Sequence, residues 1–326
     1  MIHSSIFKLL ITTILISIII TTYNFENLKA EENEVSIHEE RVQLYKKTEA
    51  LTNVPWYILA AVDQYERNVN NVDDEERITG IQVPEDKWYG FLEFDSERKH
   101  LESTVQMFEG IGKDGNGNGY AESNNDEDAL FTVGLYIYEE LGNGKTYDEI
   151  FEMFFGREKA ASLINQYAQI FKHFNTTDLH ERVFPIPKYH NYSYRSTWGA
   201  GRGYGGRRIH EGTDIFASYG TPVRSVSYGI VEVKGWNRYG GWRVGIRDTQ
   251  NIYHYYAHLN GFEDGIEEGT MVEPGDVIGY VGASGYGPVG TSGKFPPHLH
   301  YGMYRDNGKY EWAFDPYQSL KRWERN

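Results

Sequence analysis

Histidine and aspartate residues in the second half of the chain have the types and spacing of a metal site. His210 and Asp214 stand four residues apart, and His298 and His300 flank a single leucine. Residues two apart on a strand point to the same side, so we expect His298 and His300 to share one face. Two histidines and one carboxylate are a typical protein shell for catalytic zinc, with the fourth position left for water.

Zinc lowers the pKa of bound water from about 16 to about 7, which yields a nucleophile at neutral pH. Peptide cleavage also needs a base for the proton and a donor for the developing oxyanion. His258 ends another expected strand, 253–258, and His254 lies four residues before it on what should be the same face. Spacing alone does not rank His254 and His258. The alternative is that these are unrelated surface histidines among the 11 in the chain.

The composition excludes several kinds of catalytic site and one class of partner. The 326 residues include no cysteine, which excludes disulfides, thiolate catalysis and cysteine-bound zinc. The formal net charge of −15 argues against nucleic acid as a partner, because binding phosphates needs a basic face. Residues 1–180 hold 15 Lys and Arg against 32 Asp and Glu, whereas residues 181–326 hold 17 against 15. The two parts therefore differ in electrostatic character.

An apolar run stands near the N-terminus. Nine of the twelve residues from Leu9 to Ile20 are Leu or Ile, and Lys8 precedes them. This length suits the core of a signal peptide better than a full membrane span, although an uncleaved anchor is an open alternative. We therefore predict a signal peptide or membrane anchor over residues 1–30, export across the cytoplasmic membrane, and membrane contact only through this segment.

The pattern of apolar residues changes near residue 180. This change predicts which elements position the candidate site. Residues 38–178 are expected to form a helical domain, with an apolar stripe of helical period in 157–174. The sequence Phe184-Pro185-Ile186-Pro187 reads as an extended linker, because proline disfavours helix in the residue before it. Short alternating runs separated by glycine then predict a mainly antiparallel β domain over residues 183–320.

Three motifs of the C-terminal part together resemble those of the lysostaphin/LytM-type zinc metallopeptidases. They are His210-x-Gly212-x-Asp214, Tyr256-Ala257-His258-Leu259 and His298-Leu299-His300. The resemblance covers about residues 183–318. It implies that one zinc ion per chain is bound by His210, Asp214 and His300. It also implies that His298 is the general base and that His258 stabilises the tetrahedral intermediate.

The helical part resembles, more weakly, the lysozyme-like fold of lytic transglycosylases. Ala60-Ala61 stands in a segment that leads to Glu66, the position of the catalytic glutamate in that family. Arg67 departs from the small residue usual after that glutamate, which weakens the parallel. The fold class we predict is multidomain, with an all-α lysozyme-like N-terminal domain and a lysostaphin-type β peptidase. Glu66 is a candidate second site, and its alternative is an ordinary solvated helix glutamate.

Arginines crowd the approach to His210. We expect Arg207 or Arg208 to bind a carboxylate of the substrate, because a guanidinium can grip a carboxylate through two parallel hydrogen bonds. The alternative is a solvated face of a loop.

The combination of both parts with an N-terminal membrane segment resembles sporulation endopeptidases that cut the L-Ala–D-Glu bond of stem peptides in spore cortex. This resemblance implies a zinc endopeptidase acting on peptidoglycan stem peptide, secreted or membrane-anchored in the forespore or cortex compartment. Two alternatives stay open. One is a bifunctional wall hydrolase that also cuts glycan at Glu66, and the other is an inactive wall-binding scaffold.

Overall fold

The structure is a computed structural model that describes residues 37–325 apart from 71, 73–76, 93–98 and 204–205. The predicted signal peptide or anchor, residues 1–30, lies outside the described residues. Among the described helices, none is both long and apolar enough to cross a membrane. Residues Val42–Asn326 form one compact unit.

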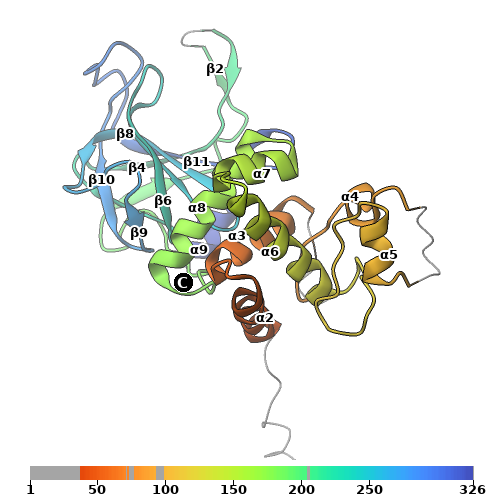
Figure 1. Ribbon diagram of the computed structural model, residues 1–326. Coiled ribbons are helices and arrows are strands. Elements are labelled where there is room, and N and C mark those ends of the chain that lie inside the picture. The colour runs from red at the N-terminus through yellow and green to blue at the C-terminus, as the bar shows by residue number, and fades with distance from the viewer. Residues whose placement is uncertain (1–36, 71, 73–76, 93–98, 204–205, 326) are drawn as a thin grey trace, which may run out of the picture. The chain divides into compact units, whose positions relative to one another are not determined.

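Helices occupy the first part of this unit, as the apolar periodicity predicts, and one short helix closes the chain (Figure 1). Their bounds are α2 Ile37–Thr52, α3 Trp56–Asn70, α4 Glu85–Tyr89, α5 Glu102–Met107, α6 Asp126–Gly142, α7 Tyr147–Phe155, α8 Glu158–Phe174 and α9 Tyr317–Trp323. The apolar stripe of α8 is buried, which confirms the helical period read from 157–174.

Local signals account for where these helices begin. Thr146 and Glu149 form a reciprocal capping box at the start of α7. Asp128 stands directly before the apolar run that starts at Ala129, so its residue type predicts that it caps α6, and this is wrong. Asn125 caps α6 by accepting from the backbone N–H groups of residues 127 and 128. The Asp128 carboxylate is buried and instead accepts N–H groups from the preceding loop, including that of Gly115.

Strands fill the chain from residue 192 onward. Their bounds are β1 Tyr192–Tyr194, β2 Gly201–Arg202, β3 Arg208–Ile209, β4 Thr213–Ala217, β5 Pro222–Arg224, β6 Gly229–Asn237, β7 Gly241–Arg247, β8 Ile252–Phe262, β9 Met271–Val272, β10 Val277–Val281, β11 His298–Asp306 and β12 Glu311–Phe314. The main sheet has the order β1-β4-β11-β8-β7-β6-β9, and β2 pairs with β3 in a separate hairpin. Every pairing between these strands is antiparallel, as the sequence predicts.

Strand β11 lies at the centre of the arrangement, between β4 and β8. Its residues alternate between two faces of the sheet. Leu299, Tyr301 and Met303 are buried in the apolar core of the sheet. His298 and His300 therefore point to the opposite face, as their spacing predicts.

The helices also contact the sheet. The Arg157 guanidinium donates to both carboxylate oxygens of Asp306 at the end of β11, at 2.6 and 2.5 Å. Lys159 pairs with Glu232 of β6 at 3.0 Å. Ile230, at the start of β6, is buried in the same apolar cluster as the helices.

Candidate metal centre

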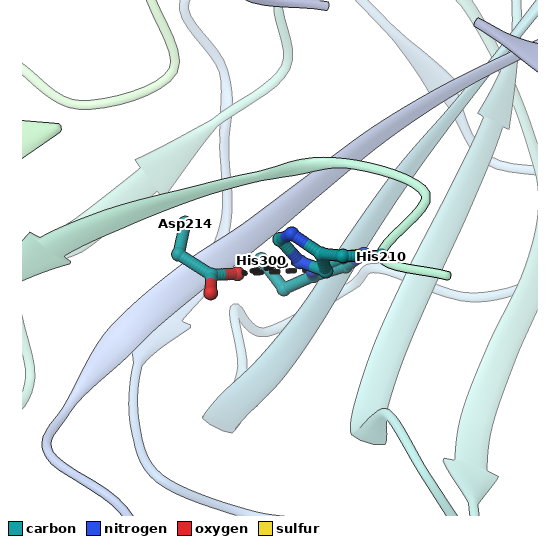
Figure 2. A group of neighbouring side chains, drawn as sticks. All are labelled: His210, Asp214 and His300. Atoms are coloured by element: carbon teal, nitrogen blue, oxygen red, sulfur yellow. Dashed lines mark hydrogen bonds and ion pairs between the residues drawn. The ribbon is translucent and has the colours of Figure 1, made fainter. Parts of the chain in front are cut away.

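Three predicted ligands converge on one point (Figure 2). His210 precedes β4, Asp214 lies on β4, and His300 lies directly across from Asp214 on β11. The Nε2 atom of His210 lies 2.8 Å from Nδ1 of His300 and 3.0 Å from Oδ1 of Asp214. The third side of this triangle, from His300 Nδ1 to Asp214 Oδ1, measures 3.1 Å. The antiparallel register of β4 and β11 thus brings together residues 86 positions apart.

This geometry fits zinc. A tetrahedral zinc ion with bonds of about 2.0–2.1 Å holds its ligand atoms about 3.3 Å apart. The observed triangle of two ring nitrogens and one carboxylate oxygen is slightly tighter. A small outward movement of the side chains therefore suffices to admit the ion, with one coordination position left open.

Neighbouring groups fix the orientation of the ligands. The His210 Nδ1–H group donates to the Thr197 carbonyl at 2.8 Å, which leaves Nε2 with a free lone pair. Arg202 donates to Oδ2 of Asp214 at 2.6 Å, so only Oδ1 faces the histidines. Burial opposes ionisation of Asp214, but the hydrogen bonds with His210 and His300 outweigh it and lower its pKa. The ligand carboxylate is therefore ionised, as metal binding requires.

The two remaining histidines present the same ring nitrogen to the site. His298 Nδ1–H donates to the Pro296 carbonyl, and His258 Nδ1–H donates to the Ser284 carbonyl, both at 2.8 Å. The Nε2 atom of His298 lies 3.6 Å from Oδ1 of Asp214. The His258 and His298 rings lie 4.9 Å apart. Burial lowers the pKa of His298, and burial with the neighbouring His300 and His298 rings holds the pKa of His258 well below its usual value.

A backbone irregularity brings His258 into the site. Between the pairs Val244↔Tyr256 and Trp242↔Leu259, β8 has one residue more than β7. This is a β-bulge, which changes the direction in which the side chains of the bulged strand point. His258 has a φ of +64°, which a residue other than glycine seldom adopts, and its N–H donates to the Gly240 carbonyl at 2.7 Å.

The expectation that His254 and His258 share a strand face is therefore wrong. His254 is fully buried on the core side, where it contacts the Tyr301 hydroxyl at 2.7 Å and Asp248 at 3.1 Å. Spacing alone does not rank these two histidines, whereas the family resemblance favours His258, and the bulge explains why only His258 reaches the metal face.

A pocket of 470 Å³ adjoins the metal ligands, with His210, His258 and His300 in its wall. Of the two arginines expected to meet substrate, Arg208 lines this pocket, with its guanidinium 4.6 Å from the ring of Tyr239. Its Nε and Nη2 atoms are buried and have no hydrogen-bond partner. Arg207 is exposed and is not part of the lining.

Sequence reasoning missed other residues of the pocket. Arg243 lines it from β7, and its Nε is likewise buried without a partner. Tyr239, Tyr255 and Tyr286 add aromatic surface. The clustering of tyrosines at residues 253–256 in the sequence was one available signal, but alternation along β8 sends only some of them to this face.

Glu66 lies on α3, away from this pocket, and is buried. Burial raises its pKa to about 8, and the Asn70 amide donates to it at 2.6 Å. It is therefore not the solvated helix glutamate of the simpler interpretation.

Known proteins are similar to this chain, over most of its length in one case and over its C-terminal part in others. Residues 208–313 match the family model described as Peptidase family M23. The L-Ala--D-Glu endopeptidase of Bacillus subtilis (strain 168) is 55% identical over 292 residues, which cover 87% of this chain and 88% of that protein. Lysostaphin of Staphylococcus staphylolyticus is 30% identical over 140 residues, or 40% of this chain and 27% of the relative.

Among solved structures, the catalytic domain of lysostaphin from Staphylococcus simulans aligns with a TM-score of 0.32 and 28% identity. That alignment covers 40% of this chain and 92% of the solved domain. The identity of 55% to the Bacillus subtilis protein extends over 87% of this chain, and the matched family model includes the predicted metal ligands. This chain belongs to peptidase family M23 and is a peptidoglycan-cleaving metalloendopeptidase.

Proposed function

We propose that the protein binds one zinc ion at His210, Asp214 and His300 and cleaves the L-Ala–D-Glu bond of peptidoglycan stem peptides. The observation that carries this proposal is the convergence of two ring nitrogens and a carboxylate oxygen within 2.8–3.1 Å of one another. The choice of bond is supported by the identity of 55% to a protein named for that cleavage.

Zinc, when bound, lowers the pKa of water and polarises the scissile carbonyl. The protein's own residues then hold and move protons. Because the Nδ1–H of His298 is committed to the Pro296 carbonyl, its Nε2 lone pair faces the site and can accept the proton of the attacking water. The resulting N–H group can deliver this proton to the leaving D-Glu nitrogen.

His258 is held in the same tautomer by the Ser284 carbonyl. Its Nε2 therefore starts as an acceptor, and it becomes an N–H donor to the oxyanion only after it takes a proton. The role implied by the family resemblance thus requires a proton to reach Nε2 of His258 during turnover.

The pocket beside the metal ligands offers groups that can bind D-Glu, the residue on the C-terminal side of the cleaved bond. In the L-Ala–D-Glu linkage the α-carboxylate of D-Glu lies next to the bond that breaks. Arg208 and Arg243 both line the pocket, and the Nε atom of each is buried without a hydrogen-bond partner. A substrate carboxylate would therefore satisfy guanidinium groups that the protein leaves open.

Mass spectrometry of peptidoglycan fragments after digestion tests the bond directly. Cleavage at L-Ala–D-Glu yields peptides with a new D-Glu amino terminus and glycan that retains L-Ala. Fragments cut at D-Ala–diaminopimelate would contradict the assigned bond while leaving the peptidase activity intact.

The cellular setting belongs to the same proposal. The apolar run at Leu9–Ile20 supports export, with either secretion or membrane anchoring, and membrane contact through this segment alone. The resemblance of both parts and the N-terminal apolar segment to sporulation endopeptidases supports a role in spore cortex maturation. For residues 38–178 we propose a lysozyme-like domain, on the strength of the Ala60-Ala61 to Glu66 segment, which lies on α3.

A second candidate function is glycan cleavage at Glu66. The observation in its favour is the raised pKa, about 8, which would keep this carboxyl protonated at neutral pH as a general acid must be. Incubation with purified peptidoglycan should then release glycan fragments that disappear in Glu66→Gln. The inactive-scaffold alternative is opposed by the presence of all the residues that the peptidase motifs require.

A further inference from the structure

A second pocket, of 910 Å³, is larger than the one at the metal ligands. It is formed by the segment 180–189 before the first strand, by the end of β11, and by α9 at the C-terminus. None of its lining residues belongs to the predicted metal site.

The two pockets open on opposite faces of the sheet. Met303 and Arg305 of β11 line the larger pocket, whereas His300 and Tyr304 line the pocket at the metal. Odd and even positions of a strand point to opposite faces. A ligand in the larger pocket therefore cannot be an extension of the peptide bound for cleavage.

The larger pocket is cationic, although the whole protein carries a net charge of −15. Five basic side chains line it against one acidic residue, Glu181. Arg182 is neutralised by Asp248 at 2.8 Å. Within the described residues, the other four form no ion pair; they are Lys188, Arg224, Arg305 and Arg322.

Two of these arginines are set into the wall of the pocket. The Nε atoms of Arg224 and Arg305 are buried and have no hydrogen-bond partner. Burial lowers the pKa of Arg224, whose Nη2 group donates to the Phe184 carbonyl at 2.9 Å. Both arginines are half-buried, and half-buried guanidinium groups without a counter-charge favour an oxyanion that enters from outside.

Apolar and aromatic surface lies beside the charges. Phe184, Met303 and Trp323 contribute buried surface to the wall, and Tyr189 is 84% exposed at the rim. An aromatic ring at a rim suits the flat apolar face of a sugar. The pocket thus combines guanidinium groups that can bind an oxyanion with apolar and aromatic side chains that can contact the rest of the ligand.

We propose that this pocket binds a cell-wall polysaccharide through an oxyanion that the polymer carries. The inference rests on the proposed function only for the origin of the ligand in the wall. With one site on each face of the sheet, the protein would hold a wall strand on one face while it cleaves a stem peptide on the other.

The test is binding of the full-length chain to insoluble cell walls, measured by sedimentation over a range of protein concentrations. The His298→Ala background prevents digestion during the measurement. Arg305→Gln and Arg322→Gln should each weaken binding, by about tenfold for the half-buried Arg305, because a charge-assisted contact is lost. Added salt should weaken binding of the parent protein toward that of Arg305→Gln.

Arg325→Gln is the matched control, since Arg325 is also exposed near the C-terminus but does not line the pocket. It should bind walls like the parent. Unchanged affinity of Arg305→Gln and Arg322→Gln, or an equal loss in Arg325→Gln, would overturn the proposal. The thermal unfolding midpoint of each variant shows whether it is folded, and the exposed Arg322 keeps the test valid if Arg305→Gln does not fold.

Two wall preparations identify the source of the oxyanion. If the loss in Arg322→Gln occurs only on walls that retain their phosphodiester polymers, the ligand is a phosphate. If it also occurs on walls stripped of those polymers, the ligand is a carboxylate of peptidoglycan itself. Release of peptides from walls by the wild-type protein is scored separately, so failure of the proposed function is distinguishable from failure of this one.

Discussion

Gly212 leaves the space that the ring of His300 occupies. A Cβ atom on Gly212 would lie 2.6 Å from Cε1 of His300 and 2.6 Å from the carbonyl oxygen of Tyr301. The glycine between His210 and Asp214 is therefore needed for close approach, since the structure gives it no left-handed φ.

Gly212→Ala should displace the His300 ring and weaken zinc binding about 10- to 100-fold, as loss of support for a ligand typically does. Zinc content after dialysis against a chelator, measured by atomic emission, checks this outcome. Gly261→Ala is the matched control, because a Cβ there meets nothing within 4 Å. Full zinc retention in Gly212→Ala would show that the site tolerates the added methyl group.

His298 and His300 share a strand face but should respond differently to substitution. His300→Ala should lose both zinc and turnover. His298→Ala should retain zinc and lose about 10²–10⁴-fold in kcat, the usual contribution of a general base. Zinc stoichiometry and the rate on a soluble stem peptide are measured on the same preparation. Equal loss of zinc in both variants would show that His298 is a ligand.

Arg208 and Arg207 are adjacent in sequence but only Arg208 lines the pocket at the metal. Arg208→Ala should lower kcat/KM about 10- to 150-fold, which corresponds to about 1.5–3 kcal/mol for a charge-assisted hydrogen bond. Arg207→Ala should be close to wild type, and neither variant should lose zinc.

The substrate provides a second control for this prediction. The loss in Arg208→Ala should largely vanish on a peptide whose D-Glu α-carboxylate is amidated, because the partner of the guanidinium is then uncharged. An equal loss on both peptides would mean that Arg208 supports the pocket in another way.

Glu66 should make the folded protein less stable as pH rises. Burial raises its pKa from 4.5 to about 8, so between these values the folded state binds more protons than the unfolded state. The free energy of unfolding therefore falls across this window. Glu66→Gln should remove the fall and add about 1–3 kcal/mol at pH 8.

Chemical denaturation at pH 5 and pH 8 measures this change, with the exposed Glu139→Gln as control. The release of peptides should be the same in Glu66→Gln as in wild type. A variant that is equally stable to wild type at both pH values would show that Glu66 is solvated.

The ligand set could be predicted because its spacing reflects regular strand geometry. His300 and Asp214 face each other across β4 and β11, and the alternation of β11 sends His298 to the same side. His258 could not be placed from alternation, because a bulge in β8 and a φ of +64° turn it to the metal face. Local patterns do not encode a register shift between two strands.

Contacts that depend on the path of loops and hairpins could not be predicted from the sequence either. Arg202 lies only 12 residues before Asp214, yet its bond to Oδ2 of Asp214 depends on the path of the β2–β3 hairpin. The same holds for the pocket behind the sheet. Its walls come from segments more than 130 residues apart, and only the folded chain brings them together.

The ion pair between Arg157 and Asp306 joins two parts of the chain that are synthesised at different times. The two residues lie 149 positions apart in the sequence, and their ion pair holds the C-terminal end of β11, the strand that begins at His298. Contacts of such long sequence separation raise the contact order and slow folding. Because chains emerge from the ribosome with the N-terminus first, the helices are made before β11 exists. The strand that carries His298 and His300 is therefore synthesised after the helical segment that its far end contacts.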